Sequence, residues 1–363
     1  IVLFTDVCNA TFNVDMKLDR LEVKGPLSFL DHYNDHVWEK INEVAHRIEN
    51  DLVTNDVRLL MGGEPTFIAR DHPDAPEWLY AANGEEKLVR GHQLMRRLWP
   101  KWAKGGVVFS GLGKSYAEEE VPRFILSCYW LKNGKNLWGS PHLLADPSKK
   151  GSTSSKKMVE MIYAIQQELE LPKEAILPIF EDETEEPLGF VLPLSFDVVS
   201  NGLKKETWAC KQKKLYANQG TAPLGQRLPL SQVLKVLPDG TKDKTAPTAL
   251  TLEIRHGNLY VFMPPVGKFA HFCVLLNAIE NAAKKTNEAI VIEGYGPPDH
   301  NTLQKFHITP DPGVLEVNIS PAANWTELEN TITDLYAEAK AVDLSTERFL
   351  VDGRHTGTGG GNH

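Results

Sequence analysis

The sequence predicts an α+β fold in which helices flank a curved, largely antiparallel sheet. Three observations predict it: an apolar fraction of 42%, the order of the elements between residues 249 and 342, and two short turns that join neighbouring strands. The order is strand, strand, helix, strand, strand, strand, helix. We therefore expect a core large enough to fold, rather than a disordered chain.

The first half of the chain mixes helical and strand patterns. Val37, Ile41, Val44 and Ile48 recur at helical spacing, with Asn34 as a candidate N-cap. From the N-terminus we predict short strands in residues 1–30, a helix over 34–50, a strand over 57–61, a helix over 84–99, a strand over 105–110 and an apolar segment over 121–131.

The middle of the chain is more polar. Residues 148–157 form a flexible stretch that suits a linker or the start of a helix, and 158–170 follow as an amphipathic helix. The acidic run at 181–186 is expected to be a solvated loop. Residues 188–250 mix strands and turns.

Regular patterns dominate the last third. Residues 249–255 and 259–263 flank the turn His256-Gly257-Asn258, and 305–309 and 314–319 flank Asp311-Pro312-Gly313, so each pair predicts a hairpin. A helix over 267–286 and a buried strand at Ala289–Glu293 separate them. Thr326 and Glu329 form a candidate capping box for a helix that ends near Val342.

Composition excludes several classes of protein. The chain has 39 Lys and Arg against 48 Asp and Glu, a net charge of −9, which argues against binding a nucleic-acid backbone. Its apolar runs are far shorter than the roughly 20 residues of a membrane span. The four cysteines form no CxxC pair and no secretory signal is visible, so we expect a cytoplasmic protein.

Familiar nucleotide and hydrolase motifs are incomplete. The segment Gly111–Ser115 lacks the first glycine of a phosphate-binding loop, because Val108 stands there. Residues 357–362 miss the dinucleotide fingerprint, and the chain has no G-x-S-x-G nucleophile motif.

Three glutamates stand inside predicted strands. Glu316 shares a strand face with Asn318, Glu253 shares one with Arg255, and Glu293 ends a buried strand. They could simply form the solvated face of an antiparallel sheet. Alternatively they converge on one hollow, where Mg²⁺ or Mn²⁺ would relieve their repulsion and hold the phosphates of a nucleotide.

Two glycine-rich segments are candidate ligand loops. Residues 354–363 contain four glycines, which let backbone N–H groups approach a ligand, and Arg354 offers a planar fork for carboxylate or phosphate. The alternative is a flexible tail. Gly62-Gly63-Glu64-Pro65 is the second candidate, with an ordinary β-turn as its alternative.

Five motifs together resemble one bacterial family. They are MGGEPTF at 61–67, VFMPPV at 261–266, VIEGYGPP at 291–298, TPDPGVLEVNISPAANW at 309–325 and LVDGRHTGTGGGNH at 350–363. The family is a domain-of-unknown-function family of amidoligases, similar to the glutamine synthetase and glutamate–cysteine ligase fold and commonly fused behind a transglutaminase-like domain. The resemblance runs from about residue 34 to the end.

The resemblance implies an ATP- and Mg²⁺-dependent carboxylate–amine ligase, with Mn²⁺ as a possible substitute, acting on small-molecule or peptide substrates through an acyl phosphate. The residues that it implies are, as catalytic groups, Glu316, Arg354 and His355; for substrate binding, Glu64, Asn318, Gly361 and Asn362; and for metal binding, Glu253, Glu293, Glu316 and His363.

The resemblance also divides the chain. Residues 1–33 would connect to a preceding domain, 34–150 would form an N-terminal α/β part, and 151–363 would form the antiparallel-sheet core. The missing initial methionine and the end directly after a glycine-rich motif predict a fragment truncated at its C-terminus. Two other functions stay open: a non-catalytic binding or scaffold module beside a transglutaminase-like domain, and a metal-dependent hydrolase.

Overall fold

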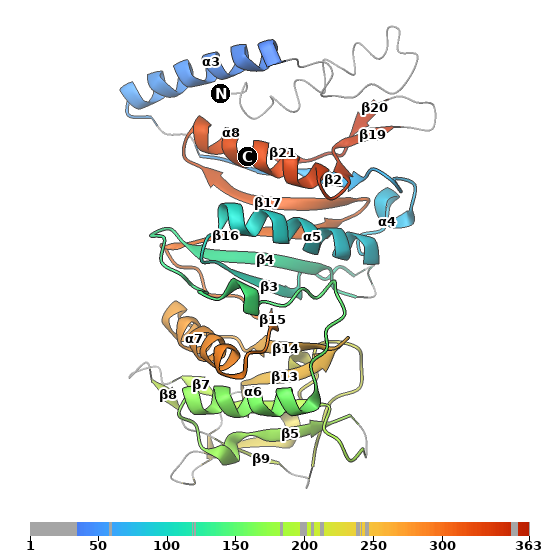
Figure 1. The fold of residues 1–363 in the computed structure, drawn as a ribbon, viewed down its shortest axis with the longest axis vertical. Helices are drawn as coiled ribbons and strands as arrows, with labels where there is room; N and C mark the ends of the chain where they lie inside the picture. The colour runs from blue at the N-terminus through green and yellow to red at the C-terminus, as the bar shows by residue number, and fades with distance from the viewer. Residues whose placement is uncertain are drawn as a thin grey trace. The chain divides into compact units, whose positions relative to one another are not determined.

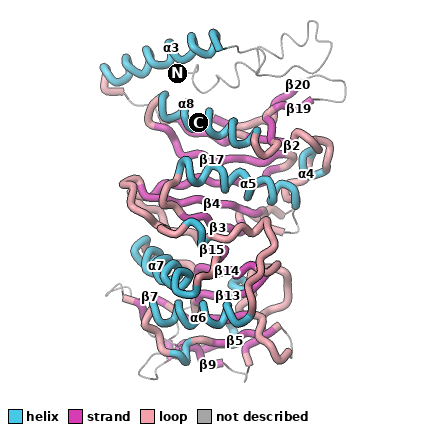
Figure 2. The backbone as a smooth tube through the Cα atoms, viewed as in Figure 1, coloured by secondary structure: helices cyan, strands magenta, loops and turns pink. Residues whose placement is uncertain are grey.

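Helices and strands cover most of the chain in a computed structural model (Figures 1 and 2). The structure describes residues 35–57, 60–117, 119, 121–181, 184–196, 202–204, 207–210, 214–236, 240, 242–243, 247–349 and 355–362. The predicted connector and strands at the N-terminus lie outside this range.

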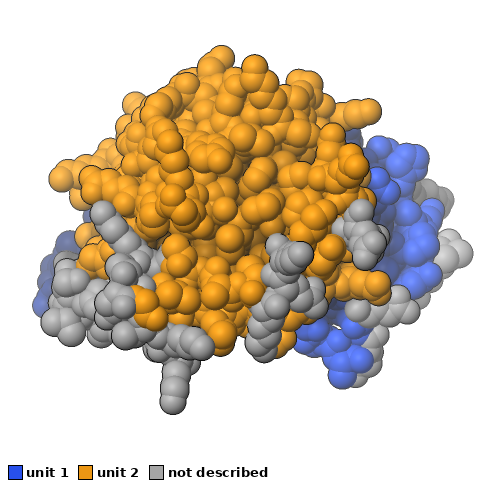
Figure 3. Space-filling model, turned by 90° about the horizontal axis from the view of Figure 1, so that it is seen from below, with its two compact units in different colours: residues 1–102, 113–126, 305–363 blue, residues 103–112, 127–304 orange. Residues whose placement is uncertain are grey.

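The chain divides into two compact units, each built from non-contiguous segments (Figure 3). Unit 1 contains Ile1–Trp102, Gly113–Leu126 and Lys305–His363, and unit 2 contains Ala103–Leu112 and Ser127–Gln304. The predicted boundary at residue 150 falls inside unit 2. It concerns a different division of the chain, and it stays a prediction.

In its described residues, unit 1 combines antiparallel strands with the helices α3, α4, α5 and α8. Its main strands run in the order β16-β17-β1-β21, and β2 pairs with β17 and β18. The elements are α3 (Asp35–Thr54), β1 (Met61–Glu64), β2 (Thr66–Ala69), α4 (Pro76–Leu79), α5 (Glu85–Trp102), β16 (Leu303–Asp311), β17 (Val314–Ala322), α8 (Trp325–Lys340), β18 (Leu344–Ser345), β19 (Glu347–Phe349), β20 (His355–Gly357) and β21 (Gly361–Asn362).

Helices α5 and α8 cover one face of the unit 1 strands. A Cβ atom on Gly91 of α5 would lie 3.1 Å from Leu126 Cδ1, so a larger residue there would require this leucine side chain to shift. The ring of Trp102 packs edge-on against Phe306 of β16, with centroids 5.1 Å apart. Burial of such side chains stabilises the unit by roughly 2 kcal/mol each. The opposite face of β16 and β17 is therefore left for polar side chains.

Unit 2 contains a mixed sheet. Its strands run in the order β10-β5-β6-β13-β14-β15-β3-β4. The elements are β3 (Val107–Leu112), β4 (Phe124–Leu131, which begins in unit 1), α6 (Ser155–Glu168), β5 (Leu177–Phe180), β6 (Gly189–Pro193), β7 (Ser195–Phe196), β8 (Leu203–Lys204), β9 (Thr207–Cys210), β10 (Leu215–Tyr216), β11 (Val233–Val236), β12 (Lys242–Asp243), β13 (Ala249–Arg255), β14 (Asn258–Met263), α7 (Phe269–Thr286) and β15 (Ile290–Gly294).

The strand pairings in unit 2 include parallel neighbours within the predicted, largely antiparallel sheet. β13 pairs antiparallel with β6 and β14, but β15 pairs parallel with both β14 and β3. Helix α7 makes the crossover from β14 to β15, which is how parallel neighbours are joined. Its residues Phe272, Leu276 and Ile279 are fully buried.

Most predicted elements of the last third are confirmed, with one local correction. Asn324, and not Thr326, caps α8: its side chain accepts a hydrogen bond from Glu327 N, and Glu327 accepts one from Ala323 N. Residues 62–65, predicted as a ligand loop with a β-turn as the alternative, lie largely in strand β1. In the described part of the chain, no helix has both the length and the apolar character that crossing a membrane requires.

Candidate functional site

The hairpin of β16 and β17 sets the geometry of a polar surface in unit 1. Its turn contains Gly313 at φ +73°, a conformation that favours glycine, and it pairs Asp311 with Val314. The same register places Thr309 opposite Glu316 and His307 opposite Asn318. Because side chains alternate along a strand, these four residues share the face opposite the buried Leu315 and Val317.

Strands β1 and β2 extend this surface on the other side of β17. Gly63 pairs with Ile319 and Thr66 with Glu316 in one register, which places Glu64 opposite Asn318. Two rows of side chains therefore cross these strands. One contains Thr309, Glu316 and Thr66, and the other contains His307, Asn318 and Glu64. We call the surface the carboxylate face; its residues are Glu64, Thr66, Thr309, Glu316 and Asn318.

Hydrogen bonds fix the orientation of Glu316. Asn318 Nδ2 donates to Glu316 Oε1 at 2.7 Å and is also 3.2 Å from Thr309 Oγ1. Thr309 Oγ1 donates to the same carboxylate oxygen at 3.3 Å. The buried hydroxyl of Thr66, in the same row, has no hydrogen-bond partner in the described part of the chain. This leaves a polar group that a ligand can satisfy.

The electrostatics of the carboxylate face disfavour the charged form of Glu316. Burial raises its pKa above the usual value, the hydrogen bond from Asn318 lowers it, and the negative charges of Glu64 and Asp311 raise it again. Glu64 and Asp311, on neighbouring strands, thus both repel the charged form of Glu316. A bound cation would relieve that repulsion.

The glycine-rich segment lies against this surface. Strand β21 pairs antiparallel with β1, with Gly361 opposite Glu64 and Asn362 opposite Gly63. Thr358 Oγ1 donates to Thr66 O at 2.8 Å. A Cβ on Gly360 would approach Glu64 O to 3.0 Å and Thr66 N to 3.2 Å, so a larger residue would push the segment away. The segment is therefore part of the sheet in this region.

Other predicted residues of that segment are not described in full. The backbones of His355 and Asn362 lie in β20 and β21, but their side chains lie outside the described residues. Arg354 and His363 lie outside them entirely.

Glu253 and Glu293 meet in unit 2, on either side of an arginine. Arg255, on the same face of β13 as Glu253, contacts Glu293 through Nη2, and its Nε lies 3.5 Å from Glu253 Oε1. Its guanidinium carbon also lies 3.7 Å from the centre of the Tyr260 ring. We call these four residues the arginine cluster. Leu224 N donates to Glu253 Oε1 at 2.8 Å and so holds this carboxylate from a second side.

The arginine cluster is largely buried. Glu253 and Glu293 are each 4% exposed. Burial raises the pKa of Glu293 to about 7, although the charge and hydrogen bond of Arg255 lower it. Glu293 Oε1 and Arg255 Nε are buried without a hydrogen-bond partner in the described part of the chain. Arg255 thus already supplies a positive charge where a metal ion was predicted.

The three glutamates among the four predicted metal ligands do not lie in one compact unit. Glu316 belongs to unit 1, whereas Glu253 and Glu293 belong to unit 2. Across the described residues, no cluster of three or more His, Cys, Asp or Glu side chains is placed to hold a metal ion. The metal-binding roles stay predictions. They concern two separate groups of residues: Glu316 on the carboxylate face, and Glu253 with Glu293 in the arginine cluster.

Sequence reasoning missed Thr66 and Thr309. The turn at Asp311-Pro312-Gly313 could have identified Thr309, because pairing Asp311 with Val314 fixes Thr309 opposite Glu316. Thr66 gave no such signal, since β2 and β17 are far apart in sequence.

Comparisons with known proteins identify the family. A family model described as "Putative amidoligase enzyme (DUF2126)" matches residues 6–186 and 235–363. The comparison with curated proteins found no match, and neither did the comparison with solved structures. Because the family model covers most of the chain and includes the carboxylate face, the chain belongs to this amidoligase family.

Proposed function

We propose that the protein is an ATP- and Mg²⁺-dependent carboxylate–amine ligase whose active site includes the carboxylate face. One observation carries the proposal: in a chain of the amidoligase family, Glu64 and Glu316 share a polar sheet face and the glycine-rich strand β21 lies beside them. The reaction would join a carboxylate to an amine, with small molecules or peptides as substrates.

The donor set of the carboxylate face fits a hard cation. Carboxylate and carboxamide oxygens are the ligands that Mg²⁺ and Mn²⁺ prefer, and Glu64, Glu316 and Asn318 supply them. Glu316 and Asn318 are already oriented by hydrogen bonds, which reduces the reorganisation needed on binding. When bound, the ion would neutralise charge on the transferred phosphoryl group.

The chemistry has two steps that balance. An oxygen of the substrate carboxylate forms a bond to the γ-phosphorus of ATP and ADP leaves; the amine nitrogen then bonds to the acyl carbon, phosphate leaves, and the amine gives up a proton. We assign substrate contacts to Asn318, Gly361 and Asn362. We assign Arg354 and His355 to stabilising the charge of the acyl phosphate, and His363 to a metal or phosphate contact.

Glu253 and Glu293 enter this proposal under one condition. Both carboxylates contact Arg255, so either would bind a metal ion only if the arginine moved away. Breaking a buried ion pair is strongly unfavourable. We therefore place the principal metal ligands on the carboxylate face. A fused transglutaminase-like domain, if present, would be the partner that supplies or uses the amide product.

The test is Mg²⁺-dependent release of ADP by the full-length protein with a panel of amino acids and peptides. We expect Glu316→Gln to lower turnover by about 100-fold or more, because metal neutralisation contributes several kcal/mol to phosphoryl transfer. Glu43→Gln is the matched control: it makes the same change on the exposed surface of α3 in the same unit, and it should leave turnover unchanged.

Three outcomes would reject the proposal. Equal turnover by Glu316→Gln and the parent protein would show that Glu316 is not a metal ligand. Peptide binding without any ATP binding to the intact protein favours the scaffold module. Amide hydrolysis without nucleotide favours a metal-dependent hydrolase.

A further inference from the structure

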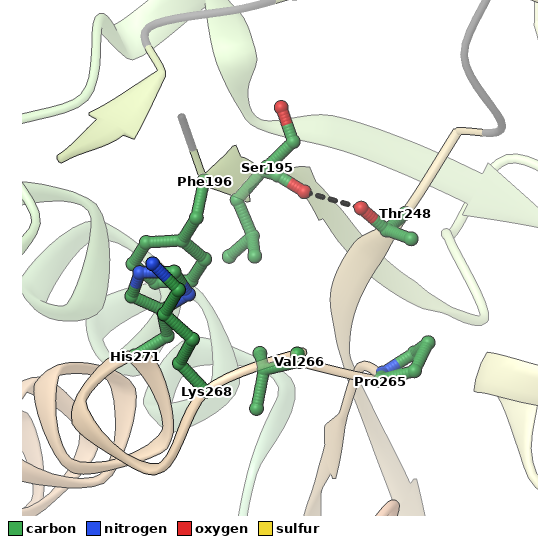
Figure 4. A pocket seen from close by; sticks show the side chains of 9 residues that line it. Ser195, Phe196, Thr248, Pro265, Val266, Lys268 and His271 are labelled. Atoms are coloured by element: carbon green, nitrogen blue, oxygen red, sulfur yellow. Dashed lines mark hydrogen bonds between the residues drawn. The ribbon is translucent and has the colours of Figure 1, made fainter. Parts of the chain in front are cut away.

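Unit 2 contains a cavity of about 260 Å³, whose wall includes Leu194–Phe196, Pro265–Lys268 and His271 of α7 (Figure 4). The ring of His271 stacks on that of Phe196, with centroids 4.0 Å apart. Its Nε2 atom is buried within the protein and does not reach the surface of the cavity, so it offers no hydrogen bond to a ligand there. A group of buried cations in unit 1 is more informative.

Lys87 of α5 holds the turn between β16 and β17 from one side. The side chain is fully buried, and its Nζ atom lies 2.8 Å from each of three backbone oxygens, those of Ala81, Ala82 and Asp311. An ammonium group has three N–H donors, so it can satisfy all three. Lys87 therefore joins the connection between α4 and α5 to the first residue of the turn.

Arg348 of β19 holds the same turn from another side. Its Nη2 atom donates to Gly313 O at 2.6 Å and to Trp78 O at 2.8 Å. β19 pairs antiparallel with β20, and Arg348 lies opposite Thr356. Because β20 belongs to the glycine-rich segment, this arginine connects the turn to that segment. We call Lys87 and Arg348 the turn clamp.

The turn lies close to the carboxylate face. The pair Thr309 and Glu316 is two residues from the turn pair that contains Asp311, or about 7 Å along the strands. The glycine-rich segment reaches the same face at its far end, where Gly361 pairs with Glu64. Two parts of the proposed active site are thus attached to one turn.

The turn clamp places like charges close together. Burial lowers the pKa of Lys87 to about 7, and the positive charges of Arg123 and Arg348 act in the same direction. The carboxylates of Glu77 and Asp311 offset part of this effect. Apolar residues of similar volume are often at least as stabilising as buried charges. What the directed hydrogen bonds of the clamp add is a fixed position of the turn backbone.

We propose that Lys87 and Arg348 are positioning residues of the ligase site, which hold the carboxylate face and the glycine-rich segment in one arrangement through the turn. The inference rests on the proposed function, and it assigns neither residue a contact with substrate or metal. Lys87 fixes the hairpin to α5, and Arg348 fixes β19, and with it β20, to the same turn. Loss of either cation should loosen the site within a folded unit.

Hydrogen–deuterium exchange of the full chain at pH 6, where Lys87 is mostly protonated, tests the clamp without a ligand. Lys87→Met should speed amide exchange in residues 303–322 about 10-fold, and Arg348→Met should do so there and in 355–362, because each variant loses hydrogen bonds from a charged group. Arg90→Met is the matched control: it removes another buried cation of α5, one that donates to backbone oxygens after α8. It should leave exchange in both ranges unchanged.

Rescue at position 348 separates positioning from packing. Arg348→Lys keeps a cationic donor for the two carbonyl oxygens, so it should restore the exchange of the parent, whereas Arg348→Met has a similar length and should not. In calorimetric titration with Mn²⁺, Lys87→Met and Arg348→Met should bind the ion about 10-fold more weakly than the parent, as for other groups that orient metal ligands. Arg348→Lys and Arg90→Met should bind it as the parent does.

Three results would overturn the proposal: exchange as in the parent for folded Lys87→Met and Arg348→Met, an equal increase in Arg90→Met, or unchanged Mn²⁺ affinity in both clamp variants. If Lys87→Met does not fold, the comparison of Arg348→Met with Arg348→Lys decides. If the parent binds no Mn²⁺, the metal site of the proposed function fails, and the exchange data alone decide whether the clamp holds the turn.

Discussion

The strand glutamates of the carboxylate face in unit 1 and of the arginine cluster in unit 2 differ in the groups that surround them. In the arginine cluster, Glu253 and Glu293 surround Arg255 and are almost completely buried. On the carboxylate face, Glu316 contacts the uncharged Asn318 and Thr309, and burial, together with the nearby charge of Glu64, raises its pKa.

This difference indicates different roles for the same residue type. A glutamate that an arginine neutralises within the fold contributes to the structure. Burial raises the pKa of both Glu293 and Glu316, but Glu293 contacts the cation Arg255 within the fold. Glu316 instead faces another acid, and a bound cation would relieve that repulsion. We therefore expect substitutions in the two regions to change stability in opposite directions.

Arg255→Met should have the largest effect on stability. It leaves two buried carboxylates without their shared cation and should lower the free energy of unfolding by about 3–5 kcal/mol. Glu316→Gln, by contrast, removes a disfavoured charge and should leave stability unchanged or raise it by up to about 1 kcal/mol. Urea unfolding of both variants measures the contrast. A loss for Arg255→Met no larger than that for Glu316→Gln would show that the arginine is not structural.

The pH dependence of stability should also separate the units. Burial, together with the charge of Lys305, lowers the pKa of His307 in unit 1 to about 4 from a usual 6.5. The unfolded state then binds more protons, so stability is complete above about pH 6.5 and falls as the pH drops toward 4, by at most about 3 kcal/mol. Glu293 has the opposite sign: its folded pKa is raised to about 7, so its stabilising contribution is complete below about pH 4.5 and disappears as the pH rises through 7.

Unfolding of the parent, His307→Gln and Glu293→Gln between pH 4 and 8 checks this assignment. His307→Gln should flatten the acid side of the profile, and Glu293→Gln should flatten the neutral side. If each variant kept the slope of the parent, the two groups would not be the source of the pH dependence.

Local patterns were enough to predict the strands and hairpins but not the contacts between distant segments. The alternation in residues 314–319 correctly placed Glu316 and Asn318 on one face, because strand periodicity is a local property. The face shared by Glu253 and Arg255 was predicted for the same reason. The contact between Arg255 and Glu293 was not, because it depends on the parallel pairing of β14 with β15 across helix α7.

Features that depend on packing or on tertiary position also escaped prediction. His271 lies at a helical position whose neighbours are apolar, so nothing in the sequence marks the cavity beside it. Glu64 was predicted from its glycine-rich motif, but its position opposite Asn318 follows only from the register of β1 with β17. The interleaving of the two units has no local signature either, because each unit closes through segments far apart in the chain.

Titration of the full chain with Mn²⁺, followed by calorimetry, tests the central assignment most directly. The parent protein should bind the ion, Glu316→Gln should lose that binding, and Glu293→Gln should keep it. Retained binding in Glu316→Gln, with loss in Glu293→Gln, would contradict the account and would place the metal ion in the arginine cluster.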